Sequence, residues 1–270
     1  MSRRDVTDKQ SSNDYLSLTT SPAVRQAYFD RLAASPSIFG STGSRLLSGS
    51  TSTHSALERR FATFFNSPAA LLFNSGWDAN VSFFATIPQP RDWVVYDELV
   101  HASVHSGLRA SRVPAAQRVS FKHNDVASLR DVLRRIRDSP SGSEGGIVFL
   151  AVESLYSMDG DMAPLPGILD VVDDYVPRER QCVVVDEAHS TGVYGENGRG
   201  VVHALGEAGG WGDEGNGEGK GRVGVRLMTF GKAIGCSGGE LSALVWKREQ
   251  YPLRYPSYFS TPPSPPLPRI

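Results

Sequence analysis

Short apolar runs alternate with helical patterns along most of this chain, and that alternation constrains the fold more than any other feature. The runs are rich in β-branched and aromatic residues and cover 71–73, 93–96, 147–152, 182–185 and 227–229. Amphipathic segments such as 126–137 lie between them. Nearly continuous apolar strands separated by helices predict an α/β fold, with a mostly parallel sheet sandwiched by helices. Ligands of such sheets bind at the carboxyl ends of the strands.

The regions outside this alternation suggest how the chain is divided. Residues 1–50 form an N-terminal segment with a Gly/Ser-rich stretch at 40–50, and residues 51–250 form the large domain. That domain opens with an amphipathic helix over 54–65, for which Ser55 and Glu58 predict a capping box.

Two segments cannot add to a packed core. Residues 206–222 hold eight glycines and six charged residues, which predicts a flexible surface insertion within the large domain. Residues 251–270 hold seven prolines, and proline interrupts helices and sheets. We expect no closing domain from such a tail.

The charge balance and the cysteines narrow the possible functions. The chain has 28 Lys and Arg against 29 Asp and Glu, so no basic field favours nucleic acid or an anionic membrane. No apolar run reaches the roughly 18 residues of a membrane-spanning helix, and the first residues lack a secretory signal. We therefore expect a cytoplasmic protein. Cys182 and Cys236 are predicted to be small apolar fillers.

A lysine follows the last apolar run, in the sequence TFGKAIG that begins at Thr229. Most neighbours of Lys232 are small, so little side-chain bulk surrounds its amine. Burial or a nearby cation at a strand end can lower the pKa of such an amine and make it a nucleophile that forms a Schiff base. From these residues alone, the alternative is a solvated lysine in a glycine-rich turn.

An acid and a histidine follow another apolar run, in the sequence DEAHSTG that begins at Asp186. An aspartate at that point can face the crevice above the sheet and pair with a protonated pyridine nitrogen. His189 lies three residues further on. The alternative is an N-cap aspartate with a histidine in the following turn.

Three further strand ends carry candidate ligand-binding residues. Ser75, Gly76 and Trp77 form a small-residue turn before a helix, where backbone N–H groups can bind a phosphate. His101 could stack on a planar cofactor, and Ser157 offers a hydroxyl. Each pattern also suits an ordinary turn or a structural histidine. We expect no metal site, because no HExxH motif and no calcium-loop spacing occurs.

Taken together, these segments resemble the α-oxoamine synthases, fold-type-I enzymes that use pyridoxal 5'-phosphate. The resemblance rests on five motifs that occur in family order: NDYLSL at 13–18, GSRLLSG at 43–49, SMDGD at 157–161, DEAHSTG at 186–192 and TFGK at 229–232. It implies a sheet of the seven-stranded type and a homodimer with stretch 40–50 at its interface. It also implies a small C-terminal domain after the lysine strand. That domain is expected to be largely missing here, with 251–270 as its truncated start.

The resemblance assigns a role to each candidate. Lys232 would bond to the cofactor aldehyde and then move protons, while Asp186 would hold the pyridinium nitrogen. His101 would stack on the cofactor ring. The remaining roles fall to two groups: His189 and Ser157 at the phenolic oxygen, and Ser75, Gly76, Trp77 and Thr229 at the phosphate.

Segment 157–165 is most similar to the members of this family that condense L-alanine with pimeloyl-CoA in biotin synthesis, with loss of CO₂. This similarity implies an acyltransferase whose partners are an amino acid and an acyl-CoA. Two alternatives stay open. One is another reaction on the same fold, by a sister synthase, a transaminase or an aldolase. The other is a catalytically silent chain that binds a partner.

Overall fold

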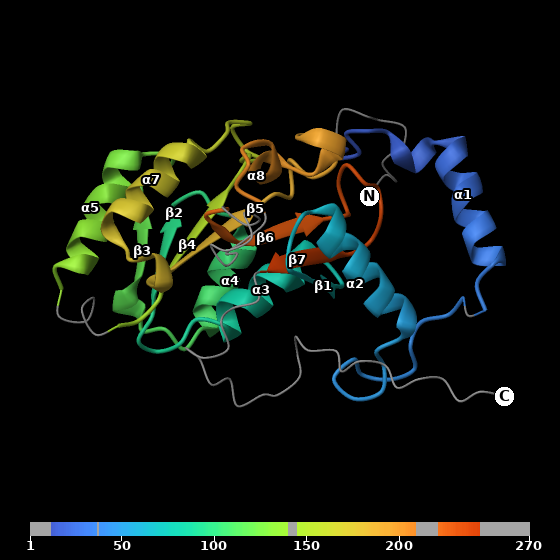
Figure 1. Ribbon diagram of the computed structural model, residues 1–270, viewed down its shortest axis with the longest axis horizontal. Helices are drawn as coiled ribbons and strands as arrows, with labels where there is room; N and C mark the ends of the chain where they lie inside the picture. Colours follow the sequence, from blue (N-terminus) through green and yellow to red (C-terminus); the bar gives the residue numbers. More distant parts are fainter. Residues whose placement is uncertain (1–11, 37, 140–144, 209–220, 244–270) are drawn as a thin grey trace, which may run out of the picture.

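The computed structural model describes residues 12–36, 38–139, 145–208 and 221–243, and a seven-stranded sheet lies at the centre of this part of the chain (Figure 1). The strands are β1 (Ala69–Phe73), β2 (Trp93–Asp97), β3 (Arg118–Phe121), β4 (Val148–Glu153), β5 (Gln181–Asp186), β6 (Val223–Thr229) and β7 (Gly239–Ala243). Their order is β1-β7-β6-β5-β4-β2-β3. All neighbours from β3 to β6 pair in parallel, and β7 is antiparallel to both β6 and β1.

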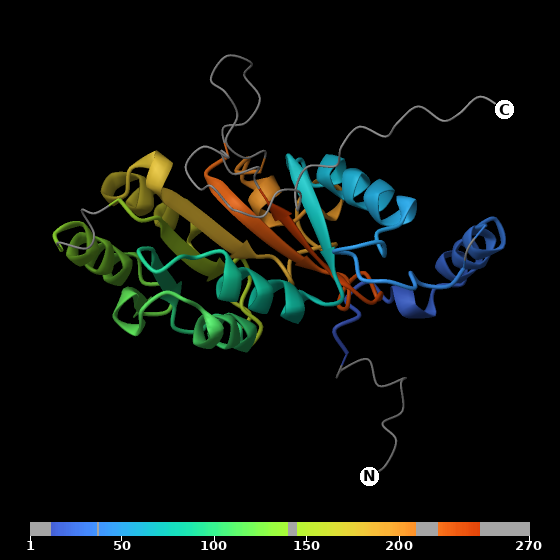
Figure 2. The ribbon, with the colours of Figure 1, turned by 90° about the horizontal axis from the view of Figure 1, so that it is seen from below.

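Helices cover both faces of this sheet. The α-helices of the described residues are α1 (Pro22–Ala33), α2 (Ser52–Phe64), α3 (Gly76–Thr86), α4 (Ala102–Ala110), α5 (Val126–Arg137), α7 (Leu165–Tyr175) and α8 (Val201–Ala204), of which α1 lies away from the sheet. Figure 2 shows α3 and α4 together on one face, with α7 and α8 on the other. This is the predicted mostly parallel α/β sandwich, and the prediction is confirmed.

Alternating side chains of the strands fill two separate cores. In β5, Val183 and Val185 pack with α5 and α7, whereas Cys182 and Val184 face α3 and α4. All six residues of β4 and all six of β5 are buried. A strand covered on both faces has no solvated side, which explains why these strands read as continuous apolar runs.

Local sequence patterns gave most elements but missed two strands. Helix α5 spans the predicted 126–137, because four aliphatic residues at helical spacing bury one face. Strands β3 and β7 were not predicted. In β3 a single residue, Phe121, is buried, so the strand carries no continuous apolar signal.

Two local predictions were wrong. The capping box of α2 uses Thr51 and His54 instead of Ser55 and Glu58, because the helix begins earlier, at Ser52. The predicted burial of Cys182 is confirmed, but Cys236 is exposed. Cys236 follows Gly235, which has a φ of 66°, in the turn beyond Lys232, so no core element covers it.

The N-terminal segment and the two irregular segments differ from the sandwich. Helix α1 projects away from the sheet in both views (Figures 1 and 2), and none of its residues is buried. Residues 209–220 of the predicted insertion and the Pro-rich tail 251–270 lie outside the described residues. The ends of the insertion are joined, since Arg222 Nε donates to Glu207 Oε1 at 2.9 Å. No helix among the described residues is long and apolar enough to cross a membrane.

Candidate active site

The carboxyl ends of β4, β5 and β6 bring the predicted chemistry together. Asp186 is the last residue of β5, and Lys232 lies in the turn that follows β6. The Nζ atom of Lys232 is 2.6 Å from Nε2 of His189, a contact across 43 residues of sequence. Parallel strands end at the same edge of a sheet, which explains why separate motifs meet there.

A buried hydrogen-bond network fixes Asp186. Asn80 Nδ2 donates to Asp186 Oδ2 at 2.8 Å and also lies 3.0 Å from Ser103 Oγ. The backbone N–H of Ala188 donates to Asp186 Oδ1 at 2.9 Å. Ser103 Oγ lies 2.6 Å from His101 Nδ1, so the network joins the two predicted site residues His101 and Asp186.

Asn80 and Ser103 were missed as site residues by sequence reasoning. Both are almost fully buried, although they are polar and lie on the apolar helices α3 and α4. Asn80 lies three residues after Trp77, and Ser103 lies two residues after His101. Nothing in the sequence showed that the two helices pack together with Asn80 and Ser103 facing each other.

Burial sets the protonation of the basic groups. The pKa of Lys232 is lowered mainly by burial, against the opposing effect of Asp186 and Glu153. Burial, followed by the charges of Lys232 and His101, lowers the pKa of His189 to about 4. The pKa of His101 is also lowered, again mainly by burial. At neutral pH both imidazoles are therefore neutral, and the lysine amine loses its proton more readily than a surface lysine.

A turn with a serine N-cap lies at the N-terminus of α3, where phosphate binding was predicted. Ser75 is the N-cap, and its Oγ accepts from the backbone N–H of Asp78 at 3.0 Å. A Cβ at Gly76 would come within 3.2 Å of Thr229 Cβ, so the residue there must be small for the two segments to approach. Trp77 meets His101 edge to face, with 5.6 Å between ring centroids. The structure thus brings Ser75, Gly76, Trp77 and Thr229 together.

Ser157 is the predicted site residue that the structure does not join to the others. It lies exposed in the turn after β4, and none of the contacts found among the described residues links it to Lys232, Asp186 or His189. The same strand instead contributes Glu153, which pairs in register with Asp186. Burial, followed by the charge of Asp186, raises the pKa of Glu153 to about 8.

These residues fit a phosphorylated pyridine aldehyde such as pyridoxal phosphate. A half-buried amine can bond to the aldehyde, and a fixed carboxylate can pair with a pyridinium nitrogen. A helix N-terminus that begins Ser-Gly offers backbone N–H groups to the phosphate. An amine, a carboxylate and a helix N-terminus are the three kinds of group that this molecule requires.

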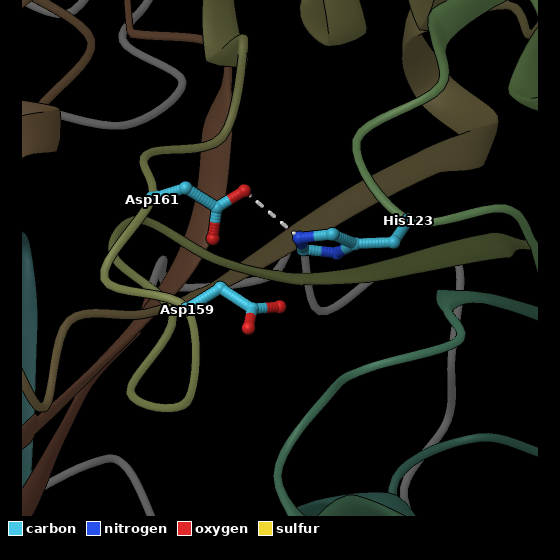
Figure 3. Close-up of side chains that lie close together, drawn as sticks. All are labelled: His123, Asp159 and Asp161. Atoms are coloured by element: carbon cyan, nitrogen blue, oxygen red, sulfur yellow. Dashed lines mark hydrogen bonds and ion pairs between the residues drawn. The ribbon is translucent and has the colours of Figure 1, made fainter.

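A second histidine cluster lies nearby, at the ends of β2 and β3 and in the turn after β4 (Figure 3). His123 Nδ1 is 2.9 Å from Asp97 Oδ1, and His123 Nε2 is 3.0 Å from Asp161 Oδ2. Burial by itself lowers the pKa of His123, but the two carboxylates outweigh it and the pKa is raised. The side chains form an acid–histidine–acid bridge.

His123, Asp159 and Asp161 each offer one atom, and these three atoms lie within 4.8 Å of one another, a spacing at which a metal ion could be held. No metal site was predicted from the sequence, and His123 follows β3, in a different part of the chain from the two acids. Both ring nitrogens of His123 already have carboxylate partners, so its hydrogen bonds account for the geometry.

Comparisons with known proteins agree with this geometry. The chain matches the family described as aminotransferase class I and II over residues 9–264. It is 47% identical over 232 residues to the 8-amino-7-oxononanoate synthase of Emericella nidulans, an alignment that covers 84% of this chain and 53% of that protein. It is 37% identical over 230 residues to the aminoacyl transferase sphA of Byssochlamys spectabilis, with 84% and 46% covered.

Solved structures show the same fold. The serine palmitoyltransferase of Sphingomonas wittichii superposes with a TM-score of 0.71 at 30% identity, covering 88% of this chain and 53% of that one. The chain spans about half the length of the relatives that it matches. The chain therefore belongs to the aminotransferase class I and II family, and within it to the α-oxoamine synthases, which are enzymes that use pyridoxal phosphate.

Proposed function

We propose that this chain binds pyridoxal 5'-phosphate through Lys232 and contributes that site to an acyltransferase that condenses an amino acid with an acyl-CoA and releases CO₂. From the family resemblance of segment 157–165 we propose L-alanine and pimeloyl-CoA as substrates, in a cytoplasmic reaction of biotin biosynthesis, and the likeness to the 8-amino-7-oxononanoate synthase of Emericella nidulans supports this choice. The observation that carries the proposal is the placement of the Lys232 amine 2.6 Å from a neutral imidazole, at the strand edge that also holds Asp186.

When bound, the cofactor supplies a conjugated ring that accepts electrons from the substrate. The chain supplies the rest. Asp186 keeps a negative charge where the pyridinium nitrogen would lie, and Asn80 and the Ala188 N–H hold its two oxygens in place. Lys232, whose pKa is lowered by burial, gives up its proton more readily than a surface lysine and can take and return a proton at the substrate α-carbon.

The proposed stacking of His101 on the cofactor ring follows from its surroundings. Its Nδ1 is engaged by Ser103, and its ring meets Trp77 edge to face. These contacts fix the imidazole plane from two sides. Ser157 remains a proposed hydrogen-bond donor to the cofactor's phenolic oxygen, on the motif alone.

A homodimer is also part of the proposal. Large apolar side chains are exposed in the N-terminal segment, with 61% of Tyr28, 86% of Phe39 and 84% of Leu47 accessible. Apolar surface of this kind on one segment is typical of an interface. Sedimentation equilibrium should show a dimer that Leu47→Glu weakens, and a monodisperse monomer would contradict this part of the proposal.

Cofactor binding is tested by visible absorption of the purified chain after addition of pyridoxal phosphate, followed by borohydride reduction and peptide mapping. We expect the reduced label on Lys232 and its loss in Lys232→Ala. Lys122→Ala is the matched control, because Lys122 is an exposed lysine in the loop after β3. Equal labelling of the Lys232→Ala chain would disprove the site and favour a silent, partner-binding chain.

The substrates are tested by product analysis with alanine, glycine or serine and with pimeloyl-CoA or palmitoyl-CoA. Alanine with pimeloyl-CoA should give the largest yield of condensed product and CO₂. Preference for serine with palmitoyl-CoA would instead favour a sister activity, in line with the structural likeness to a serine palmitoyltransferase. Amino transfer or aldol cleavage without CoA release would point to the other reactions of this fold.

A further inference from the structure

A tyrosine from the N-terminal segment contacts His189 on the side that faces away from Lys232. Tyr15 Oη lies 2.7 Å from Nδ1 of His189, although 174 residues separate them in sequence. The other ring nitrogen of His189 faces Lys232 Nζ at 2.6 Å. His189 is therefore held at both nitrogens, and one of its two partners comes from a part of the chain with no previous role in the site.

The direction of these hydrogen bonds can be worked out from the donors. Tyr15 Oη donates its single proton to Asn13 Oδ1 at 3.2 Å. A hydroxyl that has donated its proton can only accept from a further partner, so the proton between Tyr15 and His189 belongs to Nδ1. Since the pKa of His189 is lowered to about 4, its ring carries one proton at neutral pH. Nε2 is then left with a lone pair that faces Lys232.

The protonation of Nε2 decides whether the lysine can react. With a lone pair at Nε2, the imidazole accepts an N–H of Lys232, and once the amine has lost its extra proton its own lone pair stays free for a carbonyl carbon. With a proton at Nε2, the imidazole would donate to that lone pair and occupy it. An amine whose lone pair is engaged in a hydrogen bond is a weaker nucleophile.

The segment that carries Tyr15 packs against two turns, the one that holds Lys232 and the one that holds His189. A Cβ at Gly235, just after Lys232, would come within 2.8 Å of Thr19 Cγ2. A Cβ at Gly192, just after His189, would come within 3.6 Å of Leu16 Cδ1. Both glycines have positive φ, 66° and 83°, so these turns suit glycine on two counts. Asp14 Oδ1 accepts from the Leu18 N–H at 2.9 Å and closes the turn that carries Tyr15.

We infer that Tyr15 is a positioning residue of this site, whose hydroxyl holds His189 in the Nδ1–H tautomer and so keeps the Lys232 lone pair free to react. The inference rests on the proposed function of Lys232 for its chemical purpose. The tautomer itself is a property of the cofactor-free chain and can be measured there.

The test is the tautomer ratio of His189, read from the ¹⁵N shifts of the chain labelled at histidine, with His189→Gln used for assignment. We expect the Nδ1–H form to dominate in the unaltered chain and its ratio to the Nε2–H form to fall about tenfold in Tyr15→Phe. Asn13→Ala should shift the ratio in the same direction by less, because the freed hydroxyl proton can turn toward Nδ1. Tyr175→Phe, at a partly buried tyrosine at the end of α7, should leave it unchanged.

A second readout links the tautomer to reactivity. Covalent capture of pyridoxal phosphate should slow about tenfold in Tyr15→Phe and stay unchanged in Tyr175→Phe. An unchanged tautomer ratio in Tyr15→Phe overturns the inference, whatever the chain does with pyridoxal phosphate. If the ratio shifts but the unaltered chain captures no cofactor, the proposed function fails and Tyr15 still stands as the residue that orients His189.

Discussion

Two histidines of this chain are hydrogen-bonded at both ring nitrogens, and their pKa values are shifted in opposite directions. His189 lies between a tyrosine hydroxyl and a lysine amine, and its pKa is lowered to about 4. His123 lies between the carboxylates of Asp97 and Asp161, and its pKa is raised. Burial lowers the pKa in both. At His189 the charge of Lys232 adds to this effect, whereas at His123 the two carboxylates outweigh it. The neutral His189 ring can accept a hydrogen bond from Lys232, whereas His123 joins two loops through its carboxylate partners.

The largest loss of stability is expected from a change at Asp97, the buried partner of His123. This carboxylate is fully buried, accepts from His123 and also from the backbone N–H groups of Leu99 and Asn124. Asp97→Asn keeps the shape but removes the charge that balances His123, so we expect unfolding free energy to fall by about 3 kcal/mol. Urea denaturation measures the loss. Asp131→Asn, which breaks an exposed pair with Arg134, should cost about 0.5 kcal/mol or less.

The neutral state of His189 should respond to Lys232. Removing the neighbouring cation in Lys232→Met should raise the pKa of His189 by about one pH unit, or about 1.4 kcal/mol. The rise should be partial, because burial is the larger cause of the lowered value. An NMR titration measures it, with His123 as an internal reference that should not change. A His189 pKa that stays at about 4 would show that the lysine charge has no part in it.

The raised pKa of His123 predicts how stability depends on pH. The folded chain binds this proton more tightly than the unfolded chain. The stabilisation is therefore fully present below the unfolded pKa of about 6.5 and is lost as the pH rises through the folded value. His123→Gln should be less stable than the unaltered chain at pH 6, and the difference should shrink at pH 9. A difference that grows with pH would mean that the ring is neutral in the fold.

The smallest effect is expected at the other end of the bridge. Asp161 is 41% exposed, so solvent screens its attraction to His123. Asp161→Asn should lower the unfolding free energy by about 1 kcal/mol or less, well below the loss at Asp97. Equal losses at the two positions, measured in the same urea series, would show that burial does not distinguish the two carboxylates.

The sequence by itself determined most of the helices and strands, and it indicated that the candidate site residues lie near the carboxyl ends of the strands. Helix α5 and the runs within β4 and β5 are set by local periodicity, because each must bury apolar side chains at a fixed spacing. From the residues alone, Lys232 and Asp186 were candidates because they follow apolar runs closely, and the resemblance to the α-oxoamine synthases gave them their roles. These features depend on residues that are close along the chain.

Only the tertiary structure decided which distant residues touch. The contact of Tyr15 with His189 spans 174 positions, and that of Asn80 with Asp186 spans 106. The antiparallel strand β7 lies between β1 and β6 and pairs with both, so the start and the end of the described sheet are neighbours. No local pattern encodes such pairs, because they arise when helices and loops pack on a sheet already formed. The same packing sets the charge of each histidine, since burial and partners, and not residue type, determine its pKa.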